Sequence, residues 1–446
     1  MNTPICDFVR AYAERETLRL HMPGHKGRGV VGVEARDITE IDGADVLYQA
    51  TGIIRESQNN AASLFGSAKT VYSTEGSSLC IRAMLYLTLL QAKATGRRPL
   101  VAAGRNAHKV FMTAAALLDV DVEWLYPSQS TSLLSCTLTA AEVETYLSEA
   151  TERPVAVYLT SPDYLGNVAD VEAIAEVCHR FDTLLLVDNA HGAYLQFLPE
   201  SCHPLQLGAD ACCDSAHKTL SVLTGGAYLH VSHGAPTMFA EMAETAMSLF
   251  ASTSPSYLIL QSLAAENVRL AEALPRSLAE SAERVWALKK TLRRHGYTLC
   301  GDEPMKLTVA TKGYGYRGTE FAALLEEQGL VCEFADPDFV VMMLATDVGT
   351  EELAHMEMIL RSIPAREPIT EWPPRVPRLE TAMTPREALL SPSECLPVGQ
   401  CVGRVLATPS VSCPPAVPIA VCGEVLTEEA VRCFAFYGIT QCRVVI

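Results

Sequence analysis

The fold of this chain follows from two stretches, Val187-Asp188-Asn189-Ala190-His191-Gly192 and Ser215-Ala216-His217-Lys218-Thr219-Leu220. The first stretch closes an unbroken apolar run from Leu184, which is typical of a buried parallel strand that delivers Asp188 to its carboxyl end. The second stretch follows another short apolar run and carries Lys218. We therefore expect an acid and an amine at neighbouring strand ends of an α/β protein.

This pair of side chains meets the chemical needs of pyridoxal phosphate (PLP). The amine of Lys218 can form a Schiff base with the cofactor aldehyde, and the carboxylate of Asp188 can keep the pyridine nitrogen protonated so that the ring accepts electrons. The same spacing also fits a strand-end acid and a surface lysine that do not interact. Features elsewhere in the chain have to decide between these two interpretations.

Length and composition describe a globular protein with a large interior. The 446 residues are 49% hydrophobic and 20% charged, which favours two or three domains. The 35 basic and 52 acidic residues give a net charge of −17, which argues against a nucleic-acid partner and weakly favours a cationic substrate.

Cysteine usage, the first residues and the longest uncharged stretch favour a cytoplasmic protein. The 15 cysteines are odd in number and show no CxxC spacing, so we expect free thiols in a reducing compartment. The first residues lack the basic and apolar regions of a signal peptide. The longest uncharged stretch, 405–423, contains four prolines, so we expect no membrane helix.

Strand-like and helix-like runs alternate along the first two thirds of the chain. Strands are predicted at 100–102, 120–126, 155–159, 184–187, 209–213 and 225–231, and helices at 56–65, 79–94, 109–118, 140–150, 171–181 and 252–274. This alternation is typical of a mostly parallel sheet covered on both faces, with ligands at the carboxyl ends of the strands. Polar segments fall at four of these ends: 105–108, 160–166, 188–191 and 215–218.

Two further features suit a phosphorylated ring cofactor. Ser77 and Ser78 open the helix at 79–94, where backbone N–H groups and hydroxyls can bind a phosphate, although serine is also an ordinary helix cap. His108 follows a predicted strand and could stack on a pyridine ring, although a lone histidine at a strand end is often structural.

The rest of the chain is predicted to form a smaller domain and a C-terminal part. A long helix at 281–295 leads into mixed strands and helices up to residue 363, and a proline-rich linker spans 364–376. The predicted organisation is an N-terminal segment (1–50), a large cofactor-binding domain (51–290), a small α/β domain (291–365) and a C-terminal domain (378–446).

In combination, the motifs resemble the Orn/Lys/Arg decarboxylase family, whose members are PLP enzymes of the aspartate aminotransferase fold (fold type I). The motifs that carry the resemblance are His21–Gly27, Asp37–Glu40, Arg105–Lys109, Val187–Gly192, Ser215–Thr219 and Thr253–Tyr257. The proline-rich turn at 412–418 and Gly423-Glu424 are similar to the C-terminal region of that family.

The resemblance implies a role for each matching position. Lys218 would carry the internal aldimine, Asp188 would pair with the pyridinium nitrogen, and His108 and Ala190 would pack on the two ring faces. The implied phosphate ligands are Ser77, Ser78 and Ser215, with Ser252 and Ser254 reaching the phosphate of a neighbouring subunit. His217 would lie near the scissile group or the phosphate. A homodimer or higher homo-oligomer with shared sites is implied.

The sequence departs from the family pattern in three respects. Glu75 precedes Gly76 where the family usually has asparagine, which puts the phosphate loop in doubt, and Asn189 stands where glutamate is usual. The chain also lacks the N-terminal receiver-like domain of the longer members, so their higher assemblies are not expected here.

The implied reaction is decarboxylation of arginine, lysine or ornithine to agmatine, cadaverine or putrescine, as in polyamine biosynthesis. The distal charge of such a substrate needs a carboxylate, and Asp163, Glu333, Asp336 and Asp338 lie in loops that could supply one, although solvated surface acids explain each as well. The sequence does not choose among the three substrates, nor between polyamine supply and acid tolerance.

Three other functions remain open on the residues alone. The same scaffold could run another PLP reaction, such as that of an aminotransferase or a C–S lyase. A PLP-binding regulatory protein is also compatible. A zinc site from His191, Cys212, Cys213 and His217 is disfavoured because adjacent cysteines on a strand point to opposite faces, so we expect no metal.

Overall fold

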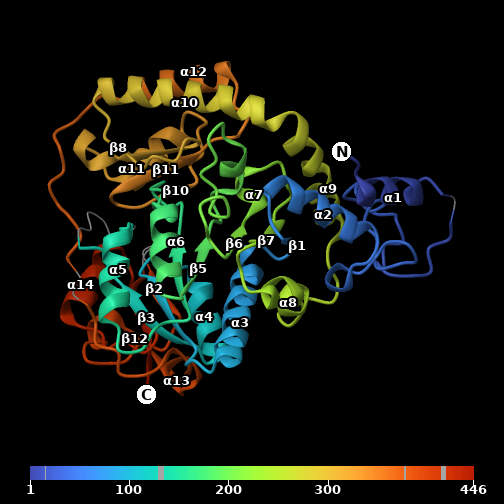
Figure 1. Cartoon of the computed structure of the whole chain (residues 1–446). Helices are drawn as coiled ribbons and strands as arrows, with labels where there is room; N and C mark the ends of the chain where they lie inside the picture. The colour runs from blue at the N-terminus through green and yellow to red at the C-terminus, as the bar shows by residue number, and fades with distance from the viewer. Residues whose placement is uncertain (16, 129–134, 376–377, 413–417) are drawn as a thin grey trace. The chain divides into compact units, whose positions relative to one another are not determined.

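The computed structural model describes residues 1–15, 17–128, 135–375, 378–412 and 418–446 (Figure 1). Two compact units make up the chain: residues 1–97 with 171–278 form the first, and 98–170 with 279–446 form the second. Most of the predicted proline-rich turn, residues 413–417, lies outside the described residues. Within the described ranges, no helix combines the length and the apolar character needed to cross a bilayer.

Four strands form the centre of the first unit. They lie in the order β1, β7, β6, β5, with bounds Lys69–Ser73, Ala227–Val231, Ala211–Asp214 and Leu184–Asp188. β5 and β6 are parallel, whereas β7 pairs antiparallel with both β6 and β1. Every residue of β6 and β7 is buried. This explains why their sequences are almost wholly apolar rather than alternating.

Helices pack on these strands from the same unit. Their bounds are α1 Pro4–Ala13, α2 Ile53–Phe65, α3 Ser77–Thr95, α6 Val171–Arg180, α7 Ala216–Thr219, α8 Thr237–Ser248 and α9 Tyr257–Glu272, with short 3-10 turns η1 Leu47–Gln49 and η2 Ala193–Phe197. α3 contacts β6, β7 and α8, and α2 contacts β1 and α9 (Figure 1). Because α3 is enclosed in this way, it buries apolar residues around most of its circumference.

Ahead of the C-terminal part, the second unit contains three parallel strands and an antiparallel sheet. β2 (Leu100–Gly104) pairs in parallel with β3 (Asp121–Leu125) and β4 (Ala156–Thr160). An antiparallel sheet has the order β10, β11, β9, β8, with bounds Phe334–Ala335, Phe339–Met343, Lys306–Ala310 and Leu299–Cys300. The helices are α4 Lys109–Leu118, α5 Ala140–Glu149, α11 Gly318–Glu326 and α12 Thr350–Ser362, together with most of α10 Leu274–His295 and the turn η3 Thr311–Tyr314.

The C-terminal part adds its own small core to the second unit. Its elements are α13 Pro385–Leu390, β12 Ser393–Pro397, η4 Val398–Gln400, β13 Ser410–Ser412, β14 Pro418–Val421, α14 Glu428–Phe436 and β15 Gln441–Val445. β12 pairs with β15 and β13 with β14. Leu406, Ile419, Phe434 and Val444 are buried together. Burial of that apolar surface is what holds this segment in a fixed structure.

Most of the predicted α/β elements are present, and two predictions need correction. The helix predicted to run to residue 274 ends at Glu272, and α10 begins at Leu274 rather than at 281. Pro275 therefore lies in the first turn of α10, where its missing N–H is not needed, instead of ending a helix. β1 and α8 were not predicted. In β1 the polar residues Lys69, Thr70 and Ser73 mask the strand pattern.

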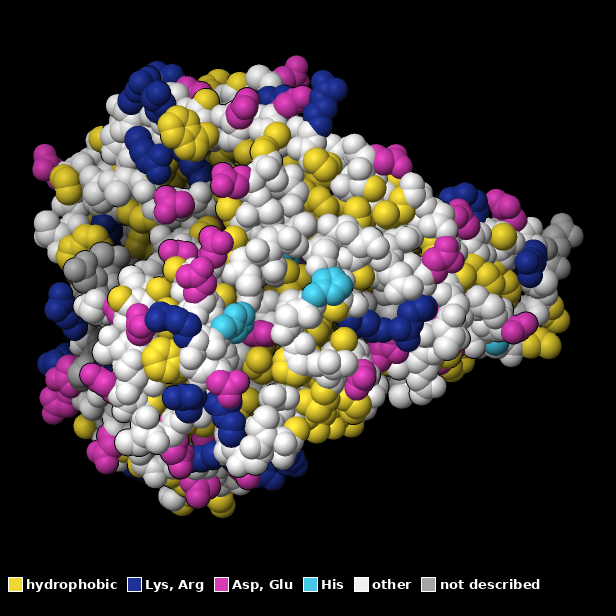
Figure 2. Space-filling model, viewed as in Figure 1, with side chains coloured by type: hydrophobic (Ala, Val, Ile, Leu, Met, Phe, Trp, Pro, Cys, Tyr) yellow, Lys and Arg dark blue, Asp and Glu magenta, His cyan; other side chains and the backbone are white. Residues whose placement is uncertain are grey.

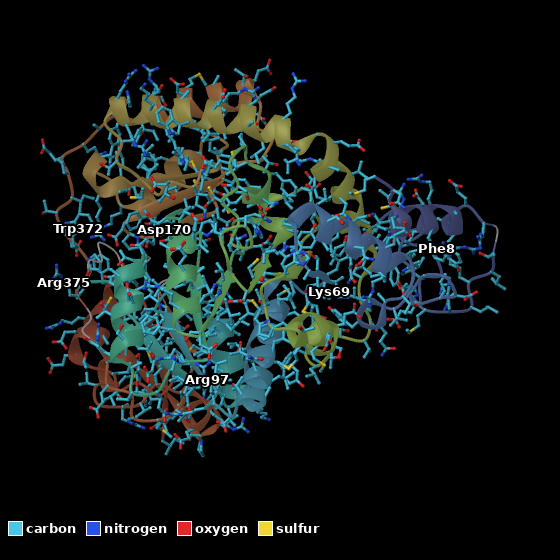
Figure 3. All side chains as sticks on the ribbon, in the orientation of Figure 1. Phe8, Lys69, Arg97, Asp170, Trp372 and Arg375 are labelled. Carbon is cyan, nitrogen blue, oxygen red and sulfur yellow. The ribbon has the colours of Figure 1, made fainter. Side chains whose placement is uncertain are left out.

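Side chains fill the space between the elements (Figure 3). In the first unit, ion pairs connect β1 and α2 to α8. Lys69, at the start of β1, places its Nζ 2.7 Å from the Oε1 of Glu244 on α8, and Arg55 of α2 pairs with the same carboxylate. The visible surface mixes charged and hydrophobic side chains (Figure 2). The exposed large hydrophobic residues include a group near the N-terminus, Leu18, Leu20, Met22, Val30 and Val31.

A buried ion pair anchors the C-terminal part to the end of β2. Both guanidinium nitrogens of Arg105 lie 2.8 Å from the two carboxylate oxygens of Glu424. The side chains are only 8% and 1% exposed. The Oε2 of Glu424 also accepts the backbone N–H of Val421 at 2.9 Å. A bidentate pair in this environment satisfies both charges, and loss of either partner leaves the other buried and unpaired.

We expect Glu424→Gln to lower the free energy of unfolding by about 3–5 kcal/mol, because the guanidinium of Arg105 loses its counter-charge. Denaturant titration followed by circular dichroism measures this change. Glu429→Gln is the matched control, since Glu429 pairs with Arg432 on the surface and should change stability by no more than about 0.5 kcal/mol. Equal losses in the two variants would contradict the assigned role of the buried pair.

Candidate active site

Lys218 and His191 form the centre of the candidate site in the first unit. The Nζ of Lys218 lies 3.0 Å from the Nε2 of His191, within hydrogen-bonding distance. Lys218 belongs to the short helix α7 after β6, and His191 follows β5. His191 is buried whereas Lys218 is exposed. The amine is therefore reachable from solvent and has a proton donor or acceptor beside it.

Asp188 is the last residue of β5 and is 3% exposed. Its Oδ1 accepts the backbone N–H of Ala190 at 3.2 Å and the thiol of Cys213 at 3.5 Å. The strand register pairs Asp188 with Cys213 of β6, two residues before Ser215. The acid therefore ends β5, and the loop that leads to the lysine follows the adjacent strand β6 of the same unit.

Asn189 joins the two loops that carry these residues. Its backbone N–H donates to the carbonyl of Cys213 at 3.0 Å, and its side-chain amide donates to the Oδ1 of Asp214 at 2.7 Å. Gly192 leaves room for this side chain, because a Cβ there would lie 2.0 Å from the Oδ1 of Asn189. These contacts fix the Asp188–His191 turn in one position against the loop that carries Lys218.

Hydroxyl groups gather at the start of α3. Ser215 donates a hydrogen bond from its Oγ to the Oγ of Ser77 at 2.8 Å, so the lysine loop and the first turn of α3 are in contact. Ser78 is the second residue of this 19-residue helix and is half-buried. Gly76 precedes the helix with φ of 73°, and its N–H donates to the carbonyl of Gly225 at 2.7 Å. Backbone N–H groups of a first turn and two or three hydroxyls suit a phosphate.

His217 and the Ser252–Ser254 loop lie in the same unit. The Nδ1 of His217 is 3.0 Å from the carbonyl oxygen of Gly226, so this nitrogen donates and the ring is held in place. The backbone N–H of Ser252 donates to the Oε1 of Glu75, and Ser252 and Ser254 are exposed. Whether these two serines reach the phosphate of a neighbouring subunit stays a prediction.

His108 belongs to the second unit, where it is the N-cap residue of α4. Its Nδ1 accepts the backbone N–H of Val110 at 3.3 Å, and the side chain is exposed. The cap explains its position in the strand-to-helix turn. Its stacking on a cofactor ring stays a prediction.

The four acids considered for the distal charge of a substrate all have structural partners in the second unit. Asp163 accepts the backbone N–H groups of Leu165 and Asn167, both at 2.9 Å, and burial raises its pKa above the ordinary value. Glu333 accepts a hydrogen bond from the Oη of Tyr164. Asp336 accepts the backbone N–H groups of Asp338 and Phe339, and Asp338 forms an ion pair with the Nζ of Lys312. These contacts account for the acids without a substrate.

Sequence reasoning missed several residues of this region. His191 was noted only in the sequence motif and as a possible zinc ligand, and Asn189 only as a departure from the family pattern. Among the described residues one group of possible metal ligands lies together, His203, Asp214 and His230. It shares no member with the zinc set considered from the sequence. Only long-range contacts reveal it, because its members come from three separate segments.

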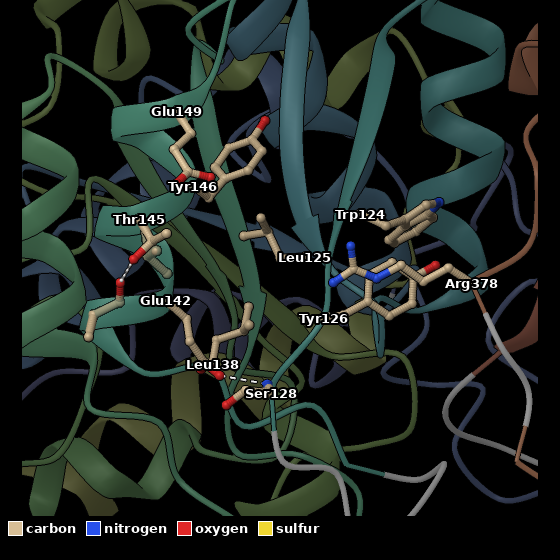
Figure 4. A pocket seen from close by; sticks show the side chains of 12 residues that line it. Trp124, Leu125, Tyr126, Ser128, Leu138, Glu142, Thr145, Tyr146, Glu149 and Arg378 are labelled. Atoms are coloured by element: carbon tan, nitrogen blue, oxygen red, sulfur yellow. Dashed lines mark hydrogen bonds between the residues drawn. The ribbon is translucent and has the colours of Figure 1, made fainter.

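The second unit also contains a pocket of about 430 Å³ between α5 and the end of β3 (Figure 4). Trp124, Tyr126, Tyr146 and Arg378 line it, and no predicted site residue does. Its acid Glu142 already accepts the backbone N–H of Ser128 at 2.6 Å and caps α5. The polar groups there are used in local structure, so this pocket lacks the chemistry of the lysine site.

The residues of the lysine site fit PLP. Lys218 supplies a reachable amine, Asp188 supplies a buried carboxylate at the adjacent strand end, and Ser77 and Ser215 place hydroxyls at a helix N-terminus. These are the three functions that a fold type I site has to provide for the aldehyde, the ring nitrogen and the phosphate.

Comparison with known proteins agrees with this geometry. The family model described as "Orn/Lys/Arg decarboxylase, major domain" matches residues 3–300. The chain belongs to the Orn/Lys/Arg decarboxylase family. An arginine decarboxylase of Bacillus subtilis (strain 168) is 30% identical over 480 residues, which cover 96% of this chain and 92% of that protein. An arginine decarboxylase of Halalkalibacterium halodurans is 29% identical, with 96% and 91% covered.

Solved structures support the fold of this Orn/Lys/Arg decarboxylase. The lysine decarboxylase of Francisella novicida superposes with a TM-score of 0.79 at 16% identity, covering 100% of this chain and 81% of that chain. The constitutive lysine decarboxylase of E. coli gives 0.77 at 18% identity, covering 100% and 82%. The predicted family and fold are thereby confirmed, and the protein is a PLP-dependent amino-acid decarboxylase.

We expect Gly192→Ala to push Asn189 away from Asp214, because the new methyl group cannot share the space of the Asn189 side chain. Overpacking of this size costs about 1–3 kcal/mol of stability, and we expect faster loss of PLP on dialysis. Thermal unfolding and absorbance measure the two effects. Gly234→Ala is the control, since a Cβ there lies 3.7 Å from its neighbour. Unchanged PLP retention in Gly192→Ala would refute the tight packing of this turn.

Proposed function

We propose that this enzyme decarboxylates arginine to agmatine with PLP bound at Lys218. The observation that carries the proposal is that an exposed Lys218, with His191 beside its amine, follows β6, and the buried Asp188 ends the adjacent strand β5 of the same unit. The choice of arginine rests on relatives named arginine decarboxylase that are 29–30% identical over 96% of the chain. Lysine and ornithine are the competing substrates.

When PLP is bound, its ring accepts the electrons of the bond that is broken at the substrate Cα. Asp188 would hold the proton on the ring nitrogen, and its burial strengthens that interaction. Ser77, Ser78 and Ser215 would bind the phosphate. Ala190 would pack on one face of the ring.

Lys218 and His191 are the groups suited to move the proton that the product needs. A nitrogen-to-nitrogen distance of 3.0 Å allows the proton to pass between them. His217 has one ring nitrogen engaged with the carbonyl of Gly226, so it is better suited to binding than to proton transfer. We therefore assign proton return to Lys218, with His191 as its partner.

The substrate is tested by incubating the PLP-loaded enzyme with arginine, lysine and ornithine separately. We expect CO₂ release with agmatine as product, and a kcat/KM for arginine at least about tenfold above the others, since a charge-assisted hydrogen bond contributes at least about 1.4 kcal/mol. A preference for lysine or ornithine would contradict the choice of arginine. Formation of a keto acid would instead indicate an aminotransferase.

The assignment of Lys218 is tested by Lys218→Ala, which should remove the visible absorbance of the PLP-loaded protein and lower turnover by more than about 10³-fold, because the covalent attachment is lost. Lys93→Ala on the exposed end of α3 is the control.

Asp188→Asn should still bind PLP but lose about 10²–10⁴-fold in kcat. Turnover close to wild type in either site variant would overturn the corresponding role.

A further inference from the structure

Asp214, His203 and His230 of the first unit form a fully buried cluster. The Nε2 of His203 lies 3.0 Å and the Nε2 of His230 lies 3.3 Å from the same oxygen, Oδ2, of Asp214. All three residues are 0% exposed. The other oxygen of Asp214, Oδ1, accepts the side-chain amide of Asn189 at 2.7 Å. A carboxylate buried this deeply is stable as an anion only because several donors surround it.

The hydrogen bonds of His203 show which of its nitrogens faces Asp214 with a proton. The Nδ1 of His203 accepts the backbone N–H of Leu205 at 3.4 Å, so the Nε2 donates to Asp214. The Nδ1 of His230 lies 2.8 Å from the Oγ1 of Thr70. Burial lowers the pKa of His230, so this ring stays neutral.

The proton position on His203 argues against a metal ion bound through its Nε2. A histidine that binds a metal through Nε2 must present that nitrogen deprotonated, and its Nδ1–H then donates to an acceptor. His203 has a backbone donor, Leu205 N–H, at its Nδ1 instead. Although burial opposes the charge of Asp214, His203 and His230 hold the pKa of that carboxyl below its usual range. The cluster is thus a buried carboxylate that accepts hydrogen bonds from His203 and Asn189 and lies 3.3 Å from the Nε2 of His230.

The position of Asp214 gives this anion a relation to the site. Asp214 is the last residue of β6 and directly precedes Ser215, which begins the loop of Lys218. Through Asn189 its carboxylate also holds the turn that follows Asp188. One buried side chain therefore contacts or adjoins both loops, while the backbone of Asn189 adds a second bond to Cys213.

We propose that Asp214 is a positioning residue of the lysine site, which fixes the Asp188–His191 turn against the Lys218 loop and supplies a permanent buried negative charge beside it. This inference rests on the proposed function only in that PLP binds at Lys218. It holds for any substrate.

The other titratable groups that face Asp214 do not carry charge that would cancel it. Cys80 of α3 and Cys212 and Cys213 of β6 are fully buried thiols whose pKa values are raised by burial and by Asp214 or Asp188. Burial likewise raises the pKa of Tyr228 on β7. Asp188 ends the adjacent strand, so two buried carboxylates precede the loops of the site and would favour positive charge there.

Asp214→Asn in the PLP-loaded enzyme tests the proposal, because it removes the charge with little change in shape. The protonated imine at Lys218 loses a favourable interaction, so the pH midpoint of the visible absorbance should shift downward. We expect a downward shift of roughly 0.5–1 unit, the size that a buried charge beyond direct contact produces. We also expect PLP to dissociate at least about threefold faster.

Asp210→Asn is the matched control at the other end of β6. Asp210 is also buried, and its Oδ2 accepts the Nε2 of His179 at 3.1 Å and the N–H of Leu185 at 2.8 Å. It should lower the melting temperature as much as Asp214→Asn does, yet leave the absorbance midpoint and PLP retention unchanged. A purely structural Asp214 would make the two variants alike, and that result overturns the proposal.

Two further measurements cover the remaining outcomes. If Asp214→Asn does not fold, Asn189→Ala removes the connection but keeps the charge, and it should speed PLP loss without moving the midpoint. PLP loss equal to that of Asp210→Asn would refute the positioning role. One equivalent of tightly bound metal per chain, lost in His203→Gln, would show a metal site instead. If these results hold but the arginine assay fails, only the proposed substrate is refuted.

Discussion

The parallel pairing of β5 with β6 is the constraint on which this site depends. Its register places Asp188 beside Cys213, so the residues that follow, Asn189 just after β5 and Asp214 at the end of β6, come within hydrogen-bonding distance. A slip of one residue would turn Asp188 to the opposite face of the sheet. The continuous burial of both strands prevents such a slip, because every residue must fit a packed environment on both sides.

Buried charge is handled in the same way in both units. Arg105 and Glu424 form a bidentate pair in the second unit, and Asp214 is surrounded by His203, His230 and Asn189 in the first. Each arrangement lies at or just after the carboxyl end of a strand and connects segments far apart in the chain. Since an unmatched buried charge costs several kcal/mol, such clusters allow few alternative packings. They give the loops around them defined positions, which covalent chemistry on a cofactor requires.

Much of the fold could be predicted because apolar runs of strand and helix length are local properties. The helix at 109–118 has the predicted bounds, and the helix predicted at 140–150 ends one residue earlier, at Glu149. The misses have local causes as well. Pro275 was taken as the end of a helix although proline is also favoured in a first turn, and β1 carries too many polar residues to show a strand pattern. The predicted domain boundaries stay a prediction.

For the site, the sequence by itself determined that an acid follows one buried strand and a lysine follows the next, and that hydroxyls open a helix. Those features depend only on residue type and spacing. Only the tertiary structure decided that His191 contacts Lys218, that Asn189 meets Asp214, and that His203 and His230 share its carboxylate. The physical reason is that hydrogen-bond partners are set by strand register and by the packing of distant segments. Neither leaves a trace in the spacing of residues along the chain.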